Sequence, residues 1–151
     1  MLSLVLVGCQ TLDREAPADW IMKGRVVVVT PEASQRLSIF WRQNSQDFEI
    51  LLTATLGTSV ARLVSEGDLH YLDLPGEPRQ FAASPAQLLL EATGLNLPLD
   101  SLVPVFRGRK QSGDIGGWQV STLATDAEGR PQRVEAYREG VTIKLTVTEW
   151  L

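Results

Sequence analysis

Regular alternation of apolar and polar side chains over residues 35–63 constrains the fold of this chain most strongly. Over residues 37–42 and again over 48–52, apolar residues recur at every second position. A period of two is typical of strands that bury one face, and the polar segment 44–47 between the two runs predicts a turn. A third alternating run follows Gly57. We therefore expect three successive strands, with the rest of a curved sheet built around them.

Similar runs on both sides of this meander extend the predicted sheet to nine or ten strands. The further runs cover residues 24–30, 69–74, 79–81, 118–123, 133–138 and 141–148. Short turns between successive strands favour antiparallel pairing, and a sheet of this many twisted strands tends to curl or close. The fold class predicted for the 151 residues is mainly β, a single-domain incomplete antiparallel β-barrel.

Two helices are expected midway along the chain. Ser84, Pro85 and Gln87 form an S-P-x-Q start signal with a cap at Ser84, and Gly94 ends this first helix. The second helix, near residues 100–107, is apolar nearly all round, with Asp100 or Ser101 as its expected cap. Because such a helix must be covered, we expect both helices to lie over an apolar cavity on the concave face of the sheet.

Charge and residue counts exclude several classes of function. The net charge of −4 and pI near 5.0 give no reason to expect a nucleic-acid partner. With one Cys and one His, His70, the chain has no internal disulfide, no recognisable metal site and no catalytic triad. Glu49, Glu91 and Asp100 are available for a cavity, but no acid–base pair stands out from their spacing, so we expect neither enzyme activity nor a cofactor.

The N-terminal residues resemble a lipid-attachment signal, the alternative being an apolar N-terminal strand or tail with an incidental Cys. Leu6-Val7-Gly8-Cys9 resembles the bacterial lipobox, in which the Cys is lipidated and the chain is cut before it. We therefore divide the chain into a truncated lipoprotein signal (1–8), a lipidated tether (9–19) and a barrel domain (20–151). No Lys or Arg precedes Cys9, so we expect the natural start to lie upstream of Met1.

Seven segments in order along the chain resemble the LolB family of outer-membrane lipoprotein receptors. They are LVGC at 6–9, GRVVV at 24–28, IFWRQ at 39–43, TLGTSVARL at 55–63, GLNLPLDSL at 94–102, GGWQV at 116–120 and IKLTVTEW at 143–150. None is a catalytic signature, so the resemblance depends on their order and spacing. It implies an incomplete β-barrel whose apolar cavity is covered by helices, in agreement with the strand count.

The resemblance also implies a function without covalent chemistry. A LolB-like protein accepts lipoproteins from the periplasmic carrier LolA and inserts them into the outer membrane without ATP. It works as a monomer anchored by its own lipid, here on Cys9, to the inner leaflet and facing the periplasm. Leu56 and Gly57 correspond to a loop that touches the membrane. Candidates for the acyl cavity are Trp41, Phe48, Ile50, Leu52, Leu89, Phe106, Trp118, Ile143 and Leu145.

Two other functions remain open from the sequence. One is a lipocalin-like binder of free lipids or small apolar molecules, anchored at Cys9, which would have the same fold. The other is a structural outer-membrane lipoprotein, which predicts a filled core. For each single cavity candidate, ordinary core packing is the alternative interpretation.

Overall fold

The computed structural model describes residues 19–54, 59–93, 96–108 and 112–151. Within them, ten strands form one antiparallel sheet in the order β6-β5-β4-β3-β2-β1-β10-β9-β8-β7. The strands are β1 (Trp20–Val29), β2 (Ser34–Asn44), β3 (Asp47–Ala54), β4 (Ser59–Glu66), β5 (Leu69–Asp73), β6 (Gln80–Phe81), β7 (Ser112–Ile115), β8 (Trp118–Thr125), β9 (Pro131–Arg138) and β10 (Val141–Trp150). The first and last strands pair in the middle of the sheet, while β6 and β7 form its two edges.

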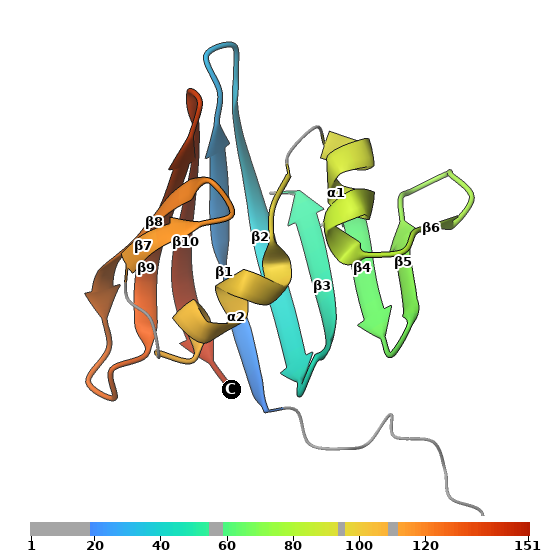
Figure 1. The fold of residues 1–151 in the computed structure, drawn as a ribbon. Helices are drawn as coiled ribbons and strands as arrows, with labels where there is room; N and C mark the ends of the chain where they lie inside the picture. Colours follow the sequence, from blue (N-terminus) through green and yellow to red (C-terminus); the bar gives the residue numbers. More distant parts are fainter. Residues whose placement is uncertain (1–18, 55–58, 94–95, 109–111) are drawn as a thin grey trace, which may run out of the picture.

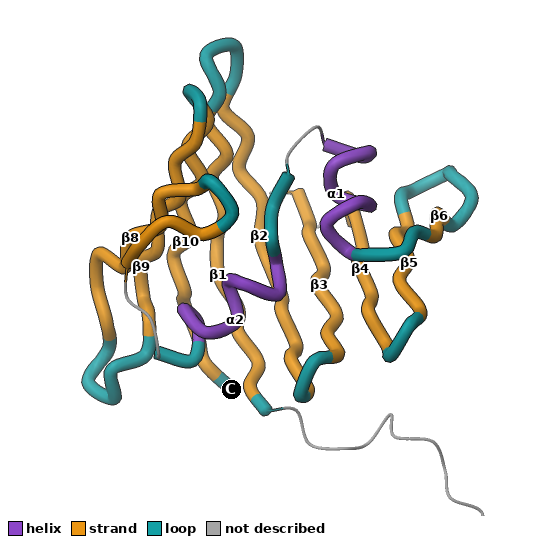
Figure 2. Tube along the Cα trace, viewed as in Figure 1, coloured by secondary structure: helices purple, strands orange, loops and turns teal. Residues whose placement is uncertain are grey.

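Both helices follow β6 in sequence and precede β7. Figure 1 shows α1 (Pro85–Thr93) and α2 (Leu99–Phe106) in front of the same face of the sheet, and Figure 2 shows the strands behind them as one continuous layer. The sheet is therefore not closed, and the predicted incomplete barrel with two short helices is confirmed. We call the face toward the helices the inner face. The upper end is the one with the β1–β2 turn (30–33), and the lower end is the one with the β2–β3 turn (45–46).

A row of large side chains crosses the inner face beneath the helices. Met22, Trp41, Ile50, Leu63 and Leu72 are register partners in sequence across β1 to β5. All five are buried, with no more than 6% of any of them exposed. Burying each such side chain contributes about 1.5–3 kcal/mol, so this row, which we call the core row, ties these five strands together.

The N-terminal cap predicted from the sequence is present in α1 but not in α2. In α1 the backbone N–H of Gln87 donates to Ser84 Oγ at 3.2 Å, which confirms the predicted cap. The Gln87 side chain does not return to the Ser84 backbone but donates to Glu91 at 3.1 Å. In α2 the residue at the cap is Pro98, without a side-chain cap, so the prediction of Asp100 or Ser101 was wrong. The helix begins two residues early because packing of Leu99 into the core outweighs capping.

Two special backbone positions shape the sheet. Glu139 and Gly140 both have positive φ, 47° and 83°, which matches the twist of a two-residue hairpin between β9 and β10. At Lys23 and Gly24 the register between β1 and β10 shifts, which marks a β-bulge. A Cβ on Gly24 would overlap the carbonyl oxygen of Thr146, so the close approach of β10 at the bulge requires glycine.

Candidate functional site

The inner face is covered unevenly, and its upper half leaves apolar side chains partly open. Toward the upper end from the core row, Ile39 pairs with Leu52, and Leu52 pairs with Ala61. One step further, Val26 pairs with both Leu37 and Leu145. We call the half-buried residues of this region the inner apolar patch: Val26, Leu37, Ile39, Leu52, Ala61, Val141 and Ile143.

Two properties of the inner apolar patch suit hydrocarbon. All seven members are aliphatic, and none of them carries a charge or a hydrogen-bonding side chain. They come from five strands, β1, β2, β3, β4 and β10, so their relative positions are fixed by the backbone ladder rather than by loops. Leu89 of α1 is also half-buried and packs against the same core. A partly open aliphatic surface of this kind is a candidate site for an acyl chain.

The nine cavity candidates predicted from the sequence fall into two groups. Leu52, Leu89 and Ile143 are half-buried and belong to or border the inner apolar patch. The other six are packed in the core with at most 7% of their surface exposed: Trp41, Phe48, Ile50, Phe106, Trp118 and Leu145. The second group therefore belongs to the packed core next to the inner apolar patch. The members that were not predicted are Val26, Leu37, Ile39, Ala61 and Val141, which the same period-two alternation places on the inner face.

Aromatic rings hold α2 against the lower half of the inner face. The Phe106 ring lies 5.1 Å from that of Trp41 and 6.0 Å from that of Trp20, measured between centroids. Trp20 also contacts Trp150 on β10 at 5.6 Å. Aromatic pairs in such tilted arrangements add about 0.5–1.5 kcal/mol each beyond the area they bury. This cluster fixes α2 over the lower half of the inner face, while α1 lies closer to the upper end, in front of β3 and β4 (Figure 1).

At the lower end, polar groups replace the apolar surface. Arg107, just after α2, donates to Asp19 Oδ2 at 2.9 Å and to the carbonyl of Ser45 at 3.3 Å, so it joins the start of β1 to the β2–β3 turn. A hollow of about 620 Å³ opens beside it. In its lining, Ser65 Oγ lies 2.8 Å from Nδ1 of His70, which is half-buried.

The hollow at the lower end has its polar groups already paired. Gln43, with 1% of its surface exposed, accepts from Trp41 Nε1 at 2.9 Å and donates to the carbonyl of Ser45 at 2.9 Å. Ser65 and His70 satisfy each other. Because buried polar groups that are already paired gain little from a ligand, this hollow is a weaker candidate than the inner apolar patch.

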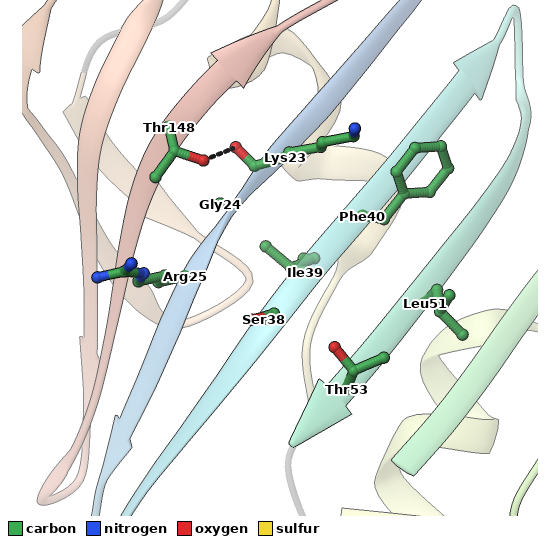
Figure 3. A pocket seen from close by; sticks show the side chains of 9 residues that line it. All are labelled: Lys23, Gly24, Arg25, Ser38, Ile39, Phe40, Leu51, Thr53 and Thr148. Atoms are coloured by element: carbon green, nitrogen blue, oxygen red, sulfur yellow. Dashed lines mark hydrogen bonds between the residues drawn. The ribbon is translucent and has the colours of Figure 1, made fainter. Parts of the chain in front are cut away.

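A second hollow, of about 400 Å³, lies on the outer face of the sheet (Figure 3). Its lining comes from β1, β2, β3 and β10. Apart from Gly24 and Ile39, which belong to the inner-face positions of their strands, the lining residues alternate along the strands with residues of the inner face. Phe40 and Leu51, which are register partners, form its apolar floor, and Lys23 and Arg25 stand beside it. We call this hollow the outer groove; its residues are Lys23, Gly24, Arg25, Ser38, Ile39, Phe40, Leu51, Thr53 and Thr148.

The titratable groups described next, whose pKa values are shifted, lie away from the inner apolar patch. On the outer face near the β5 edge, Arg79 donates to both carboxyl oxygens of Asp73, at 2.7 and 3.0 Å. This hydrogen bonding, helped by the nearby charge of Arg62, holds the pKa of Asp73 below its usual range. Arg62 donates to Glu49 at 3.2 Å, and this bond raises the pKa of the guanidinium. These ion pairs stabilise the sheet edge and have no counterpart in the patch.

Two of the carboxylates that the sequence offered for a cavity, Glu49 and Glu91, lie away from the inner apolar patch. Glu49 is bound to Arg62 on the outer face, and Glu91 is exposed on α1. Cys9, Leu56 and Gly57 lie outside the described residues, as do the predicted signal and most of the tether. Within the part of the chain that is described, no helix combines the length and hydropathy needed to cross a bilayer.

The fold and its inner face define a class: an open antiparallel β-barrel, partly roofed by two helices, with an aliphatic surface exposed inside. The family model described as "Outer membrane lipoprotein LolB" matches residues 18–150 of this chain. The chain belongs to the LolB family.

Similar proteins called "Outer-membrane lipoprotein LolB" occur in several bacteria. The protein of Thiobacillus denitrificans is 30% identical, covering 99% of this chain and 93% of its own length. The protein of Pseudomonas putida strain W619 is 31% identical over 87% of this chain and 73% of its own length. That of Aeromonas salmonicida is 26% identical over 97% of this chain and 91% of its own length. The resemblance inferred from seven short segments is thereby confirmed over nearly the whole chain.

Proposed function

We propose that this protein is an outer-membrane lipoprotein receptor that takes acyl chains of lipoproteins onto the inner apolar patch and passes them to the membrane. The observation that carries the proposal is the inner apolar patch itself, seven aliphatic side chains that remain half-buried on the inner face. Membership of the LolB family supports the same function, since its relatives are named outer-membrane lipoproteins.

Binding of hydrocarbon supplies the whole driving force in this proposal. Each methylene group moved from water to an apolar surface contributes about 0.8 kcal/mol, so a lipoprotein does not leave a membrane or carrier for water unaided. If the patch buries two more methylene groups than the carrier does, the equilibrium shifts by about 1.6 kcal/mol, or about fifteenfold. Transfer then runs downhill without ATP, cofactor or covalent intermediate.

Rigidity and openness of the patch fit cargo of varied acyl length. Its members are held on five paired strands, and the core row below them is fully packed. The periplasmic donor in this proposal is LolA or a carrier like it, and the receptor acts as a monomer.

The two membrane-directed parts of the proposal concern residues outside the described ranges. Cys9 carries the lipid that anchors the protein to the inner leaflet of the outer membrane, with the barrel facing the periplasm. Leu56, followed by Gly57, touches the same leaflet and helps release cargo into it. The supporting observation is the place of residues 55–58 in the sequence between β3 and β4, whose inner side chains Leu52 and Ala61 belong to the patch.

A transfer assay tests the proposal. LolA loaded with a labelled lipoprotein is mixed with the chain carrying Cys9→Ala, and the label is followed from carrier to receptor by affinity separation. We expect most of the label to move to the receptor without nucleotide, and to move on when vesicles are added. Label that stays on LolA, while the receptor binds free fatty acid, would replace the proposal with a binder of free lipids.

A further inference from the structure

The outer groove combines an apolar floor with positive charge, which the proposed acyl transfer does not use. Phe40 and Leu51 face outward and are only partly buried, although their strand neighbours Trp41 and Ile50 are in the core. Figure 3 shows the side chains of Phe40 and Leu51 on the adjacent strands β2 and β3, with Lys23 and Arg25 on β1. The groove holds about 400 Å³, within the range of about 300–1,000 Å³ typical of sites for small ligands.

Three of the four strands around the groove are basic in a chain that is acidic overall, whereas the fourth, β3, carries Asp47 and Glu49. β1, β2 and β10 together carry five cationic residues, Lys23, Arg25, Arg36, Arg42 and Lys144, and a single acidic one, Glu149. The net charge of the whole chain is −4, so positive charge is concentrated on these three strands. Such concentration of charge on one surface favours a negatively charged partner.

The charges nearest the groove are weakly neutralised within the protein. Lys23 Nζ lies 4.0 Å from Glu149, with about half of each side chain exposed, so this pair is loose. Among the described residues, no carboxylate lies within ion-pair distance of Arg25 or Arg36. Ser38 and Thr53 also line the groove, in the register row of Arg25, next to the row formed by Lys23, Phe40 and Leu51.

We propose that the outer groove binds the headgroup and first acyl methylenes of an anionic glycerophospholipid in the membrane surface. Lys23 and Arg25 contact the phosphate, the Ser38 and Thr53 hydroxyls donate to headgroup oxygens, and Phe40 with Leu51 contacts the glycerol end of the acyl chains. A stable protein interface needs about 20–30 residues on each partner, many more than the nine residues that line the groove. An anionic lipid matches both its charge and its size.

The groove lies on the side of the protein that the proposed function turns toward the membrane. For this orientation the inference rests on the proposed function. Thr53 is the second-last residue of β3, which ends at Ala54, immediately before residues 55–58. A lipid in the groove therefore lies next to the segment proposed to touch the leaflet. The basic outer face would turn toward the anionic surface, and the inner apolar patch would open near the same leaflet.

Vesicle binding by charge variants tests the inference. The chain carrying Cys9→Ala, which cannot be lipidated, is sedimented with vesicles of phosphatidylcholine alone or mixed with phosphatidylglycerol. Arg25→Gln should weaken binding to the mixed vesicles about fivefold, and Lys23→Gln with Arg25→Gln more than tenfold. Arg133→Gln, which removes an exposed charge from the outer face of β9, two strands from Arg25, is the matched control and should weaken binding less than Arg25→Gln does.

Each outcome decides whether the groove itself binds the lipid. Equal losses for Arg25→Gln and Arg133→Gln would show a diffuse charge effect and overturn the inference. Unchanged vesicle binding by Arg25→Gln, with weaker uptake of cargo from LolA, would assign the surface to the carrier and overturn it as well. If the parent chain takes no cargo but Arg25→Gln loses vesicle binding while Arg133→Gln keeps it, the proposed function fails and the lipid site stands.

Discussion

Placing a carboxylate in the inner apolar patch should make acyl binding depend on pH in a way that an ordinary core position would not. Leu52 is the best position because it is half-buried and its register partners Ile39 and Ala61 are both aliphatic. No inner member of the patch can pair with a new negative charge. In Leu52→Asp, an acyl chain lying on the patch would therefore require the carboxyl group to be neutral.

The free energy needed to protonate the Asp at a given pH determines how much acyl affinity is lost. With a reference pKa of about 3.9, protonation at about pH 7 costs about 4 kcal/mol, so acyl affinity should fall by up to roughly a thousandfold. At about pH 5 the cost is about 1.5 kcal/mol, and the loss should shrink to roughly tenfold. Since the neutral form binds, affinity rises as pH falls, by up to about tenfold per pH unit above the pKa.

Displacement of a fluorescent fatty-acyl probe at several pH values measures the effect, with the same titration on two controls. Leu52→Asn has nearly the same shape without the charge and should lose affinity equally at every pH. Leu123→Asp places the same carboxylate at an exposed position on β8, with 53% of Leu123 exposed, and should bind as the parent chain does. Circular dichroism confirms that each variant is folded. Probe binding by Leu52→Asp that equals the parent at about pH 7 would refute the assignment of the patch.

Three further predictions concern the bulge, the sheet edge and the membrane. Gly24→Ala should destabilise the fold by about 3 kcal/mol in denaturant titrations, because the new Cβ would overlap the backbone of Thr146. Asp73→Asn should lower stability at neutral pH by at most about 1 kcal/mol, since the pair with Arg79 is partly exposed; the lowered pKa of Asp73 makes this difference disappear as the pH falls through it. Leu56→Glu should leave the melting temperature unchanged and block insertion of cargo into vesicles.

Two of these predictions have a matched control variant, and the third is checked by its dependence on pH. In Gly129→Ala the new Cβ meets no atom within 4 Å, and the substitution is unfavourable only because φ is positive at this position. It should therefore lower the free energy of unfolding by about 1–2 kcal/mol, less than Gly24→Ala. If Gly24→Ala instead stabilises the protein, as glycine replacement does at unconstrained strand sites, the close approach of β10 is refuted. A stability difference for Asp73→Asn that persists in acid contradicts the role of the ion pair. Leu123→Glu should insert cargo normally, and normal insertion by Leu56→Glu would remove Leu56 from the mechanism.

The antiparallel meander and the first helix could be predicted from the sequence because both follow from local signals. Alternation marked the meander, and the cap at Ser84 needs only its own backbone neighbours. β7 was missed because its four residues, Ser112–Ile115, include one aliphatic side chain and a glycine, and thus show no period of two. The bulge at Gly24 was also missed, since it depends on the approach of Thr146 from the far end of the chain.

Which inner residues stay open could not be predicted, because exposure depends on where the helices come to rest. Trp41 and Ile39 are two residues apart on β2 and share the inner face, and the sequence offers no reason to separate them. The Phe106 ring of α2 lies against Trp41, which is 3% exposed, while Ile39 remains half-buried. The large aromatics, which the sequence predicted to line the cavity, are buried because they give a short helix its strongest contacts.

The division of the inner face separates stability from binding. Side chains of the core row and the aromatic cluster bury nearly all their surface, so truncating one of them should cost about 2–5 kcal/mol of folding free energy. Residues such as Leu52 and Ile143 bury less in the protein alone, and part of their apolar surface is desolvated only when hydrocarbon covers it. A receptor that must release its cargo needs this arrangement: if the aromatic cluster also covered the upper half, the protein would gain stability and lose the exposed area on which acyl binding depends.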